Sequence, residues 1–307
     1  MNKLKKVGLT ALAGSLIASN VYAAEMTATA GASLTWTSGD DDEVTGQALT
    51  MGNSVTFSGS GDMDNGMTIS VSYELDNDVM DDYSMSIGLG DGMGTVSFHG
   101  SGGAGGLSAY DDVMPNAYGE VWDNTDADDN GVVGTMTSVN NVVYSGSFGD
   151  IGISGEWAKG GNIATNAGGS DSSIVVNYSG IDGLEFGAGT GADGSTSDQD
   201  TQYIKYTVGG ITAGYQRSQI DFDAAGTNDE HRDHVALSLA VNENLSIAWG
   251  NSDVDMGTAT EEESSGVSFS YTMGSMSFGG LFNKTDNVAG ASGTNDKVTE
   301  LNVAFSF

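Results

Sequence analysis

Six residues in the middle of the chain have the spacing of a calcium-binding loop. The segment DADDNG, residues 126–131, places Asp126, Asp128 and Asn130 at alternate positions and ends on a glycine. Alternate oxygen ligands of this kind can converge on one Ca²⁺ ion, and the glycine allows the bend between them. The twelfth position is Thr137 instead of a bidentate glutamate, so the match is partial. We treat Ca²⁺ as a candidate ligand, with a solvated polar loop as the alternative.

Few other residues could support catalysis. The chain has no cysteine, and its histidines are His99, His231 and His234. No G-x-S-x-G elbow positions a serine nucleophile, and no G-x-G-x-x-G lies between a strand and a helix to cradle a phosphate. The four residues HRDH at 231–234 would point alternately to opposite faces of a strand, which weakens them as a metal site. The sequence therefore predicts a protein that is not an enzyme.

The elements that must position these residues follow a period of two. In TATAGASLTWTS, residues 27–38, alanine, leucine and tryptophan alternate with threonine, serine and glycine. Successive side chains of a β-strand point to opposite faces, so this segment has one apolar and one hydroxyl-lined face. The same alternation predicts sixteen strands. They lie at residues 26–37, 48–60, 67–75, 83–90, 94–99, 140–149, 151–159, 172–180, 184–192, 201–209, 211–220, 232–241, 245–253, 264–273, 276–284 and 297–307.

The first residues predict export. The basic segment MNKLKK is followed by an apolar run, and VYA, ending at Ala23, places small residues at the −3 and −1 positions of a cleavage site. This is the pattern of a secretory signal peptide. We therefore predict a signal peptide at residues 1–23 and one mature domain at residues 24–307. After residue 23, no segment is long and apolar enough to suggest a spanning helix.

The composition excludes several classes of protein. Asp and Glu number 42 against 9 Lys and Arg, giving a formal net charge of −33. Binding to nucleic-acid phosphates is therefore not expected. The 47 glycines and the single proline do not suit a helical protein. Regular alternation over many segments also argues against disorder.

The predicted connections alternate in length. The short ones carry Gly, Asn or Asp, as tight hairpins need. They lie at residues 62–66, 91–94, 149–151, 181–183, 209–210, 242–244 and 274–275, and acidic loops of about six to twenty residues or longer lie between them. An even-numbered meander with short periplasmic turns and long extracellular loops is typical of an outer-membrane β-barrel. A closed sheet satisfies every backbone group in lipid, and at about sixteen strands water fills the lumen. The sequence therefore predicts an all-β, antiparallel, transmembrane barrel of sixteen strands.

Several segments resemble the trimeric sixteen-stranded general diffusion porins of Gram-negative outer membranes, especially their alphaproteobacterial branch. The resemblance is carried by VTFSGSGDMDNGMTISVSYEL (55–75), GMGTVSFHG (92–100), GGLSAYDDVMPNAYGEVWD (105–123), NNVVYSGSFGDIGISGEWA (140–158) and the C-terminal FSF. It implies a homotrimer and a third loop folded into the lumen. It also implies that the barrel-assembly machinery reads the terminal Phe307 as a signal.

The long interruption at about 100–139 lies between the fifth and sixth predicted strands, where this family has its constriction loop. It contains no basic residue, and its acidic constriction candidates are Asp111, Asp112, Glu120 and Asp123. The resemblance implies an opposing cluster of Arg and Lys on the early strands, but residues 26–99 contain neither. The basic candidates for the pore wall are Lys205, Arg232 and His234, with Arg217 ambiguous.

A lumen with charges mainly of one sign predicts selectivity. Rings of Asp and Glu favour cations, because a narrow opening in a wall of low dielectric constant concentrates their field. We therefore expect passive diffusion of small hydrophilic solutes and ions, with cations preferred and no required cofactor. Outer-membrane lipid and lipopolysaccharide are the expected surroundings. The alternative is a secreted, acidic, calcium-binding, β-rich surface or adhesion protein, although no short solenoid repeat recurs.

Overall fold

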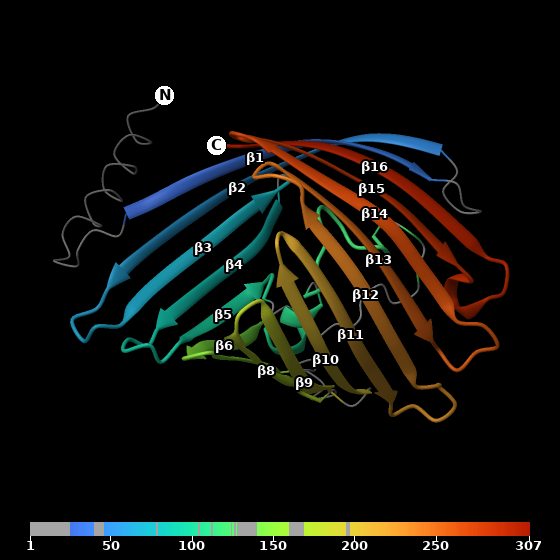
Figure 1. The fold of residues 1–307 in the computed structure, drawn as a ribbon. Helices are drawn as coiled ribbons and strands as arrows, with labels where there is room; N and C mark the ends of the chain where they lie inside the picture. The colour runs from blue at the N-terminus through green and yellow to red at the C-terminus, as the bar shows by residue number, and fades with distance from the viewer. Residues whose placement is uncertain are drawn as a thin grey trace.

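The computed structural model describes residues 25–39, 46–77, 79–103, 105–111, 113–123, 125, 127, 140–159, 169–194 and 197–307 (Figure 1). The predicted signal peptide at residues 1–23 lies outside them. The strands are β1 (Glu25–Gly39), β2 (Gly46–Asp62), β3 (Thr68–Asp76), β4 (Val79–Gly88), β5 (Thr95–Ser101), β6 (Asn141–Phe148), β7 (Ile151–Ala158), β8 (Asp171–Ile181), β9 (Leu184–Asp193), β10 (Ser197–Val208), β11 (Ile211–Phe222), β12 (Glu230–Ala240), β13 (Leu245–Asp255), β14 (Glu262–Met273), β15 (Met276–Asp286) and β16 (Asn295–Ser306). Two short 3-10 turns are η1 (Gly106–Tyr110) and η2 (Val288–Gly290). Within the described residues, no helix has the length and apolar character needed to cross a membrane.

The sheet is a closed antiparallel barrel in which each strand pairs with its neighbours in sequence and β1 pairs with β16. At the closure, Leu34 lies opposite Val303. The backbone of Phe307 extends this pairing, since its N–H donates to the Ala30 carbonyl at 2.8 Å and its carbonyl accepts from the Ala30 N–H at 3.1 Å. The predicted barrel of sixteen antiparallel strands is therefore confirmed.

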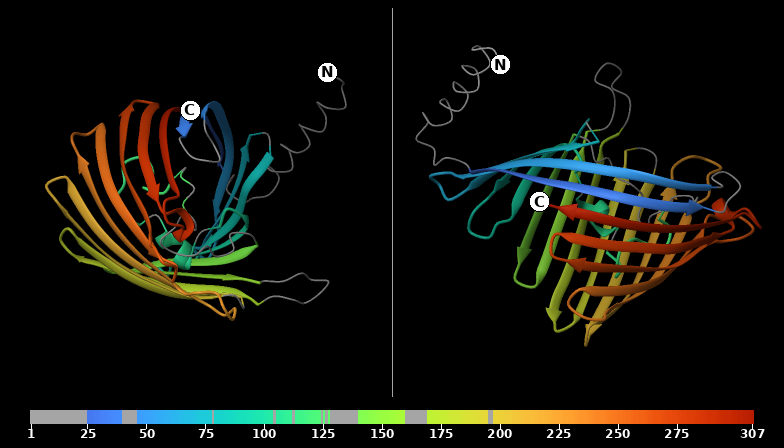
Figure 2. Two further views of the ribbon diagram at one scale, coloured as in Figure 1. Left: turned by 90° about the vertical axis from the view of Figure 1, so that its right-hand side faces the viewer. Right: turned by 90° about the horizontal axis from the view of Figure 1, so that it is seen from above.

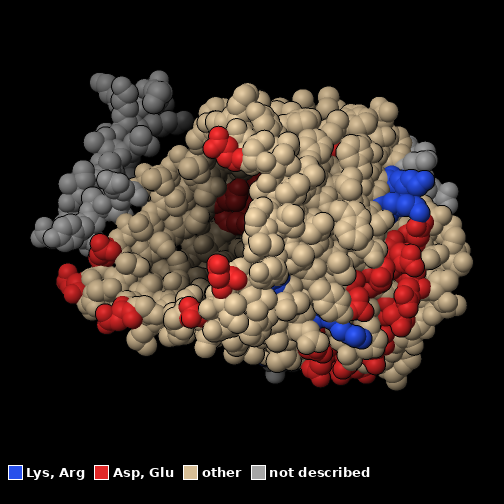
Figure 3. Space-filling view, in the orientation of Figure 1, with Lys and Arg blue, Asp and Glu red and all other residues tan. Residues whose placement is uncertain are grey.

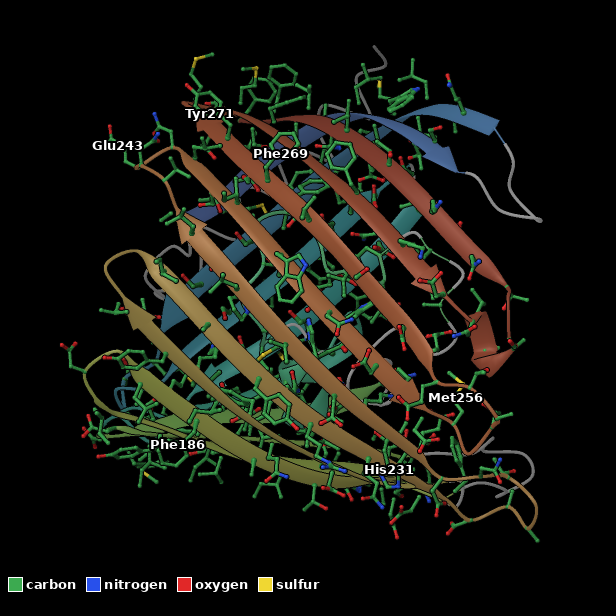
Figure 4. The ribbon with its side chains drawn as sticks, turned by 45° about the vertical axis from the view of Figure 1, so that its right-hand side comes forward. Phe186, His231, Glu243, Met256, Phe269 and Tyr271 are labelled. Carbon is green, nitrogen blue, oxygen red and sulfur yellow. The ribbon has the colours of Figure 1, made fainter. Side chains whose placement is uncertain are left out.

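The outer face of the barrel is apolar. Large side chains such as Ile69, Leu237 and Trp249 are 39%, 45% and 46% exposed. They are not covered by a second layer of protein, as they would be in a soluble sandwich. Figure 4 shows Phe269 and Tyr271 near one rim of this outer face. An exposed apolar band around a closed sheet is the arrangement that lipid requires.

The two rims differ, but less regularly than the sequence predicted. Glu243 lies in a short turn at one rim, and Met256 lies at the opposite rim, which carries most of the longer loops (Figure 4). At that second rim, however, only residues 77–78 separate β3 from β4, and only 194–196 separate β9 from β10. The prediction of long loops was wrong at these two places. The strands extend further there than apolar alternation alone indicated.

The longest connection, between β5 and β6, runs into the barrel. Figure 2 shows its described part inside the ring of strands, and η1 contacts β7, β8, β9 and β10. Here the loop and the inner wall form a small hydrophobic core. Its buried members are Leu107, Tyr110, Met114, Val121, Trp122, Val175, Tyr203 and Ala236. The loop therefore narrows the lumen, as the resemblance implied.

Candidate functional site

The loop enters the lumen through a glycine-rich segment that lies almost in contact with the wall. A Cβ atom on Gly105 would come within 2.4 Å of Val143, and one on Gly106 within 1.9 Å of the Ser173 hydroxyl. Gly106 also has a φ of +51°, which favours glycine. The adjacent Leu107 is fully buried, and its N–H donates to Ser173 Oγ at 3.0 Å. Burial of one leucine side chain contributes about 1.5–3 kcal/mol, which holds the start of the loop on β7–β9.

The middle of the loop is held on β10 and β11. The ring of Tyr110 packs edge-on against that of Tyr203, with centroids 4.9 Å apart. The Gln216 amide donates to the Tyr110 carbonyl at 2.8 Å and to Thr201 Oγ1 at 3.0 Å. Burial raises the pKa of the Tyr110 phenol to about 12. The phenol is therefore neutral throughout the physiological range.

The last described part of the loop is held on β14, β15 and β16. The Tyr118 hydroxyl donates to Glu300 Oε1 at 2.6 Å, and its ring lies over Gly279, where a Cβ would come within 2.2 Å. The Asn283 amide donates to the carbonyls of Glu120 and Asp123, at 2.6 and 3.0 Å. Three sets of contacts thus place the loop against β7–β16.

The opposite wall, β1–β5, is not covered in this way. None of its described residues is buried, and its inward positions are mostly serine and threonine. Cross-strand hydroxyl pairs occur there, with Thr27 Oγ1 and Ser58 Oγ 2.8 Å apart, and Ser70 Oγ and Ser86 Oγ 2.6 Å apart. The open part of the lumen therefore lies between the loop and a wall lined mainly by hydroxyl groups, with the acids Glu74 and Asp76 on β3.

The predicted acidic residues of the loop have different surroundings. Asp111 follows η1 and is partly exposed. Glu120 is only 6% exposed, so it lies between the loop and the wall. Asp123 is partly exposed, and its Oδ2 accepts from the Glu120 N–H at 2.8 Å. Asp112 lies outside the described residues. Asp111 and Asp123 are therefore the members of the set that reach accessible space.

The predicted basic residues also have different surroundings. All three share the inward parity of their strands. Arg232 is fully buried and its Nη2 donates to Glu230 Oε2 at 2.7 Å, while His234 is 2% exposed and packs against Trp122 of the loop. Lys205 has an accessible side chain. Arg217 points outward, since it pairs in register with the outward Asp233.

The inward positions of the strands carry mostly negative charge. The carboxylates at these positions include Glu74, Asp76, Glu156, Asp171, Glu185, Asp193, Glu230, Glu262, Asp296 and Glu300. The Lys and Arg side chains at inward positions of the described strands are Lys205 and Arg232. Figure 3 shows acidic side chains inside the opening of the barrel, and others gathered on the outer face toward the second rim. Of these carboxylates, Glu156, Asp171, Glu262, Asp296 and Glu300 are buried, and the others are partly exposed. The accessible part of the lumen therefore has an excess of negative charge.

The calcium-loop residues Asp126, Asp128 and Asn130 lie outside the described residues. In the part of the chain that the structure describes, no group of three or more His, Asp or Glu side chains could hold a metal ion. This arrangement lends no support to a calcium site. The terminal Phe307 is 78% exposed at the rim of short turns.

Sequence reasoning did not find the residues that position the loop. Asn283 and Glu300 belong to no motif, and the resemblance of residues 105–123 did not indicate what Leu107 and Tyr118 contact. Each of these residues acts through a contact between distant segments. A signal for the covered wall was nevertheless present. Apolar residues at inward positions, such as Val175 and Leu281, interrupt the polar face of strands after β5.

Comparisons with known proteins agree with this geometry. A family model described as Gram-negative porin matches residues 8–307. Among solved structures, a triple mutant of the Rhodopseudomonas blastica porin has a TM-score of 0.70 at 12% identity, covering 92% of this chain and 100% of that chain. A porin refined at 1.8 Å resolution gives 0.70 at 14% identity, with the same coverage. A loop-deletion mutant of the Vibrio cholerae outer-membrane protein OmpT gives 0.69 at 13% identity, covering 92% of this chain and 99% of that chain. The comparison with curated proteins found no match.

Proposed function

The chain belongs to the Gram-negative porin family, and from this premise we propose that its channel passes small hydrophilic solutes with a preference for cations over anions. It is an outer-membrane channel protein and not an enzyme. The alternative of a secreted calcium-binding surface protein is not favoured by this family membership.

The observation that carries the proposal is the imbalance of charge at the lumen. Partly exposed carboxylates such as Glu74, Asp76 and Asp193 occupy inward positions, whereas Lys205 is the one inward Lys or Arg of the described residues with an accessible side chain. Asp111 and Asp123 add negative charge on the loop. Between walls of low dielectric constant, this charge attracts cations and repels anions. The wall of β1–β5 is lined mainly by hydroxyl groups, and its inward charged residues include the acids Glu74 and Asp76. It therefore adds no opposing field and is compatible with neutral solutes.

The test is the reversal potential of the purified protein in a planar bilayer under a salt gradient. We expect cation preference that weakens as the Debye length falls from about 8 Å at 0.15 M to about 3 Å at 1 M salt. Neutralising Asp111→Asn and Asp123→Asn together should lower the cation-to-anion permeability ratio. Glu263→Gln is the matched control, because Glu263 faces outward. Anion preference, or equal effects of the loop and control variants, would contradict the proposal.

We further infer that the protein is a homotrimer joined through the outer face near β1. The outward positions of β1 include Ala28, Ala30 and Ala32, which would let a neighbouring barrel approach closely. No charged residue lies at an outward position of β2, and Phe57 supplies apolar area next to Ala28. Mass photometry in detergent is expected to give three copies. A monomer that retains full conductance would refute this inference.

Three further elements of the proposal concern export and assembly. We expect cleavage after Ala23, so the outer-membrane protein should begin at Ala24 by mass spectrometry. The exposed ring of Phe307 is proposed as the feature read by the assembly machinery, and Phe307→Ala should slow membrane insertion. Lipopolysaccharide is the proposed outer-leaflet neighbour. Membrane insertion of Phe307→Ala at the wild-type rate would argue against this role of Phe307.

A further inference from the structure

The distribution of basic side chains singles out one position in the lumen. All Lys and Arg residues after Lys6 lie in the described part of the chain. Lys159 lies just past β7 at the loop rim, and Arg217, Lys284 and Lys297 point outward. Arg232 points inward but is completely buried. Among the described residues, Lys205 is therefore the only Lys or Arg whose charged group can contact a solute inside the barrel.

The charge of Lys205 is held beside one carboxylate. Its Nζ lies 3.2 Å from Glu185 Oε1 and 5.3 Å from the centre of the Tyr203 ring. The Tyr203 hydroxyl donates to the same Glu185 oxygen at 2.6 Å. Tyr110 of the loop packs edge-on against Tyr203. The loop therefore fixes the position of a cation and an anion that remain 22% and 34% exposed.

The pair faces a recess between the loop and the rim of short turns. The recess has a volume of about 630 Å³, and its lining includes Asn116 of the loop, Asp182, Thr207 and Thr212 as well as Lys205 and Glu185. This volume is within the range of small-molecule sites, roughly 300–1,000 Å³. The lining combines one cation, two carboxylates, three hydroxyls (Ser179, Thr207 and Thr212) and one amide. Such a set can hydrogen-bond a small polar solute on several sides.

We propose that this recess is a transient binding subsite for zwitterionic solutes of the α-amino-acid type. The solute carboxylate would contact the Lys205 ammonium, and the solute ammonium would contact Glu185 or Asp182. Outside the recess, the acidic lumen repels the carboxylate of a solute. Inside the recess, a simple anion would still be repelled by Glu185 and Asp182, because it has no ammonium group to pair with them. An α-amino acid carries its ammonium and carboxylate groups on the same carbon atom, so its two opposite charges match the adjacent charges of Lys205 and Glu185. This inference rests on the proposed channel function, since it assumes that solutes pass the recess.

The experiment compares L-alanine with lactamide, a neutral solute of similar size, by swelling of proteoliposomes. We expect Lys205→Gln to lower the alanine-to-lactamide ratio of permeation rates by about two- to fivefold, the range expected for a partly exposed ion pair. Lys284→Gln is the matched control, because it removes the same charge from the outer face. The control should leave the ratio unchanged. An unchanged or higher ratio in Lys205→Gln would overturn the proposal.

Glu185→Gln separates a binding subsite from a general effect of lumen charge. Removing a carboxylate makes the lumen less negative, which by itself would not slow a zwitterion. The subsite predicts that Glu185→Gln also lowers the ratio, because the solute ammonium loses its partner. If this variant raises the ratio, the subsite is refuted. Lactamide flux shows whether the channel is open, and the reversal potential of the wild type shows whether it prefers cations. A failure of the proposed channel function is therefore distinguished from a failure of the subsite.

Discussion

Truncating Asn283 should loosen the loop that narrows the channel. The side chain is 4% exposed and donates two hydrogen bonds to loop carbonyls, at 2.6 Å to Glu120 and 3.0 Å to Asp123. Its position depends on the facing Gly266, where a Cβ would come within 2.0 Å of the Asn283 amide oxygen. Asn283→Ala removes both donors and leaves the loop backbone without these partners.

The size of the effect follows from these two bonds. A neutral intramolecular hydrogen bond contributes about 0.5–1.5 kcal/mol, so the variant should lose about 1–3 kcal/mol of loop docking free energy. A loss of about 2 kcal/mol lowers the ratio of docked to undocked loop roughly 30-fold. The contacts of Leu107 and Tyr110 remain, so the first half of the loop should stay in place. We therefore expect partial release near residues 118–123 and not loss of the whole constriction.

Single-channel recording in planar bilayers measures this release. Asn283→Ala should show added current fluctuations and a higher mean conductance than the wild type. Asn251→Ala is the matched control, since the Asn251 amide donates to the Ser264 carbonyl at 3.1 Å from an outward position of β13 and does not contact the loop. If the two alanine variants give the same traces as each other, these hydrogen bonds do not hold the loop.

Two further predictions address the barrel wall and the loop. Leu237→Lys should destabilise the barrel in vesicles by about 2–4 kcal/mol because its side chain faces lipid, whereas Ser238→Lys on the lumen face should change little. Equal unfolding midpoints in urea would contradict that assignment of faces. The raised pKa of Tyr110, about 12 against a usual 10.0, means that its neutral phenol supports loop docking fully below pH 10 and progressively less as the pH rises to about 12. The difference in ultraviolet absorbance between wild type and Tyr110→Phe should therefore show no tyrosinate near pH 10. Ionisation of Tyr110 near pH 10 would refute the raised pKa.

The barrel itself could be predicted because its signal is local and repeated. The strand predicted at 232–241 is observed as β12 at Glu230–Ala240, and that predicted at 94–99 as β5 at Thr95–Ser101. Prediction failed between β3 and β4, where residues 76–82 were expected to form a loop. The ladder there has a register shift between Tyr73 and Leu75, and β4 begins at Val79, ahead of two aspartates. A bulge with charged residues interrupts apolar alternation without ending the strand.

The surroundings of the site residues could not be predicted in the same way. Parity correctly indicates that Arg232 and His234 point inward, but parity does not show what covers them. The burial of His234 involves Trp122 of the loop from β5 to β6, which is distant in sequence and touches the wall through irregular backbone. Hydrogen bonds such as that of Tyr118 to Glu300 join segments separated by 182 positions. A single sequence contains no local signal for such a contact.

The side of the lumen on which the loop lies can nevertheless be argued from side-chain parity. In a barrel with a water-filled interior, inward positions should be polar, and those of β1, β3 and β5 are mainly Ser and Thr with some acids. Later strands depart from this rule, with buried apolar residues at inward positions. These are Val143, Val175, Ile220, Ala236, Ala248, Val254, Leu281 and Val298. Apolar groups left in water would lose the free energy that burial supplies, so a wall of this kind requires a cover. Part of this cover is the apolar surface of the loop residues Leu107, Met114, Val121 and Trp122. The polar wall needs no cover, so the open path past the loop lies along it.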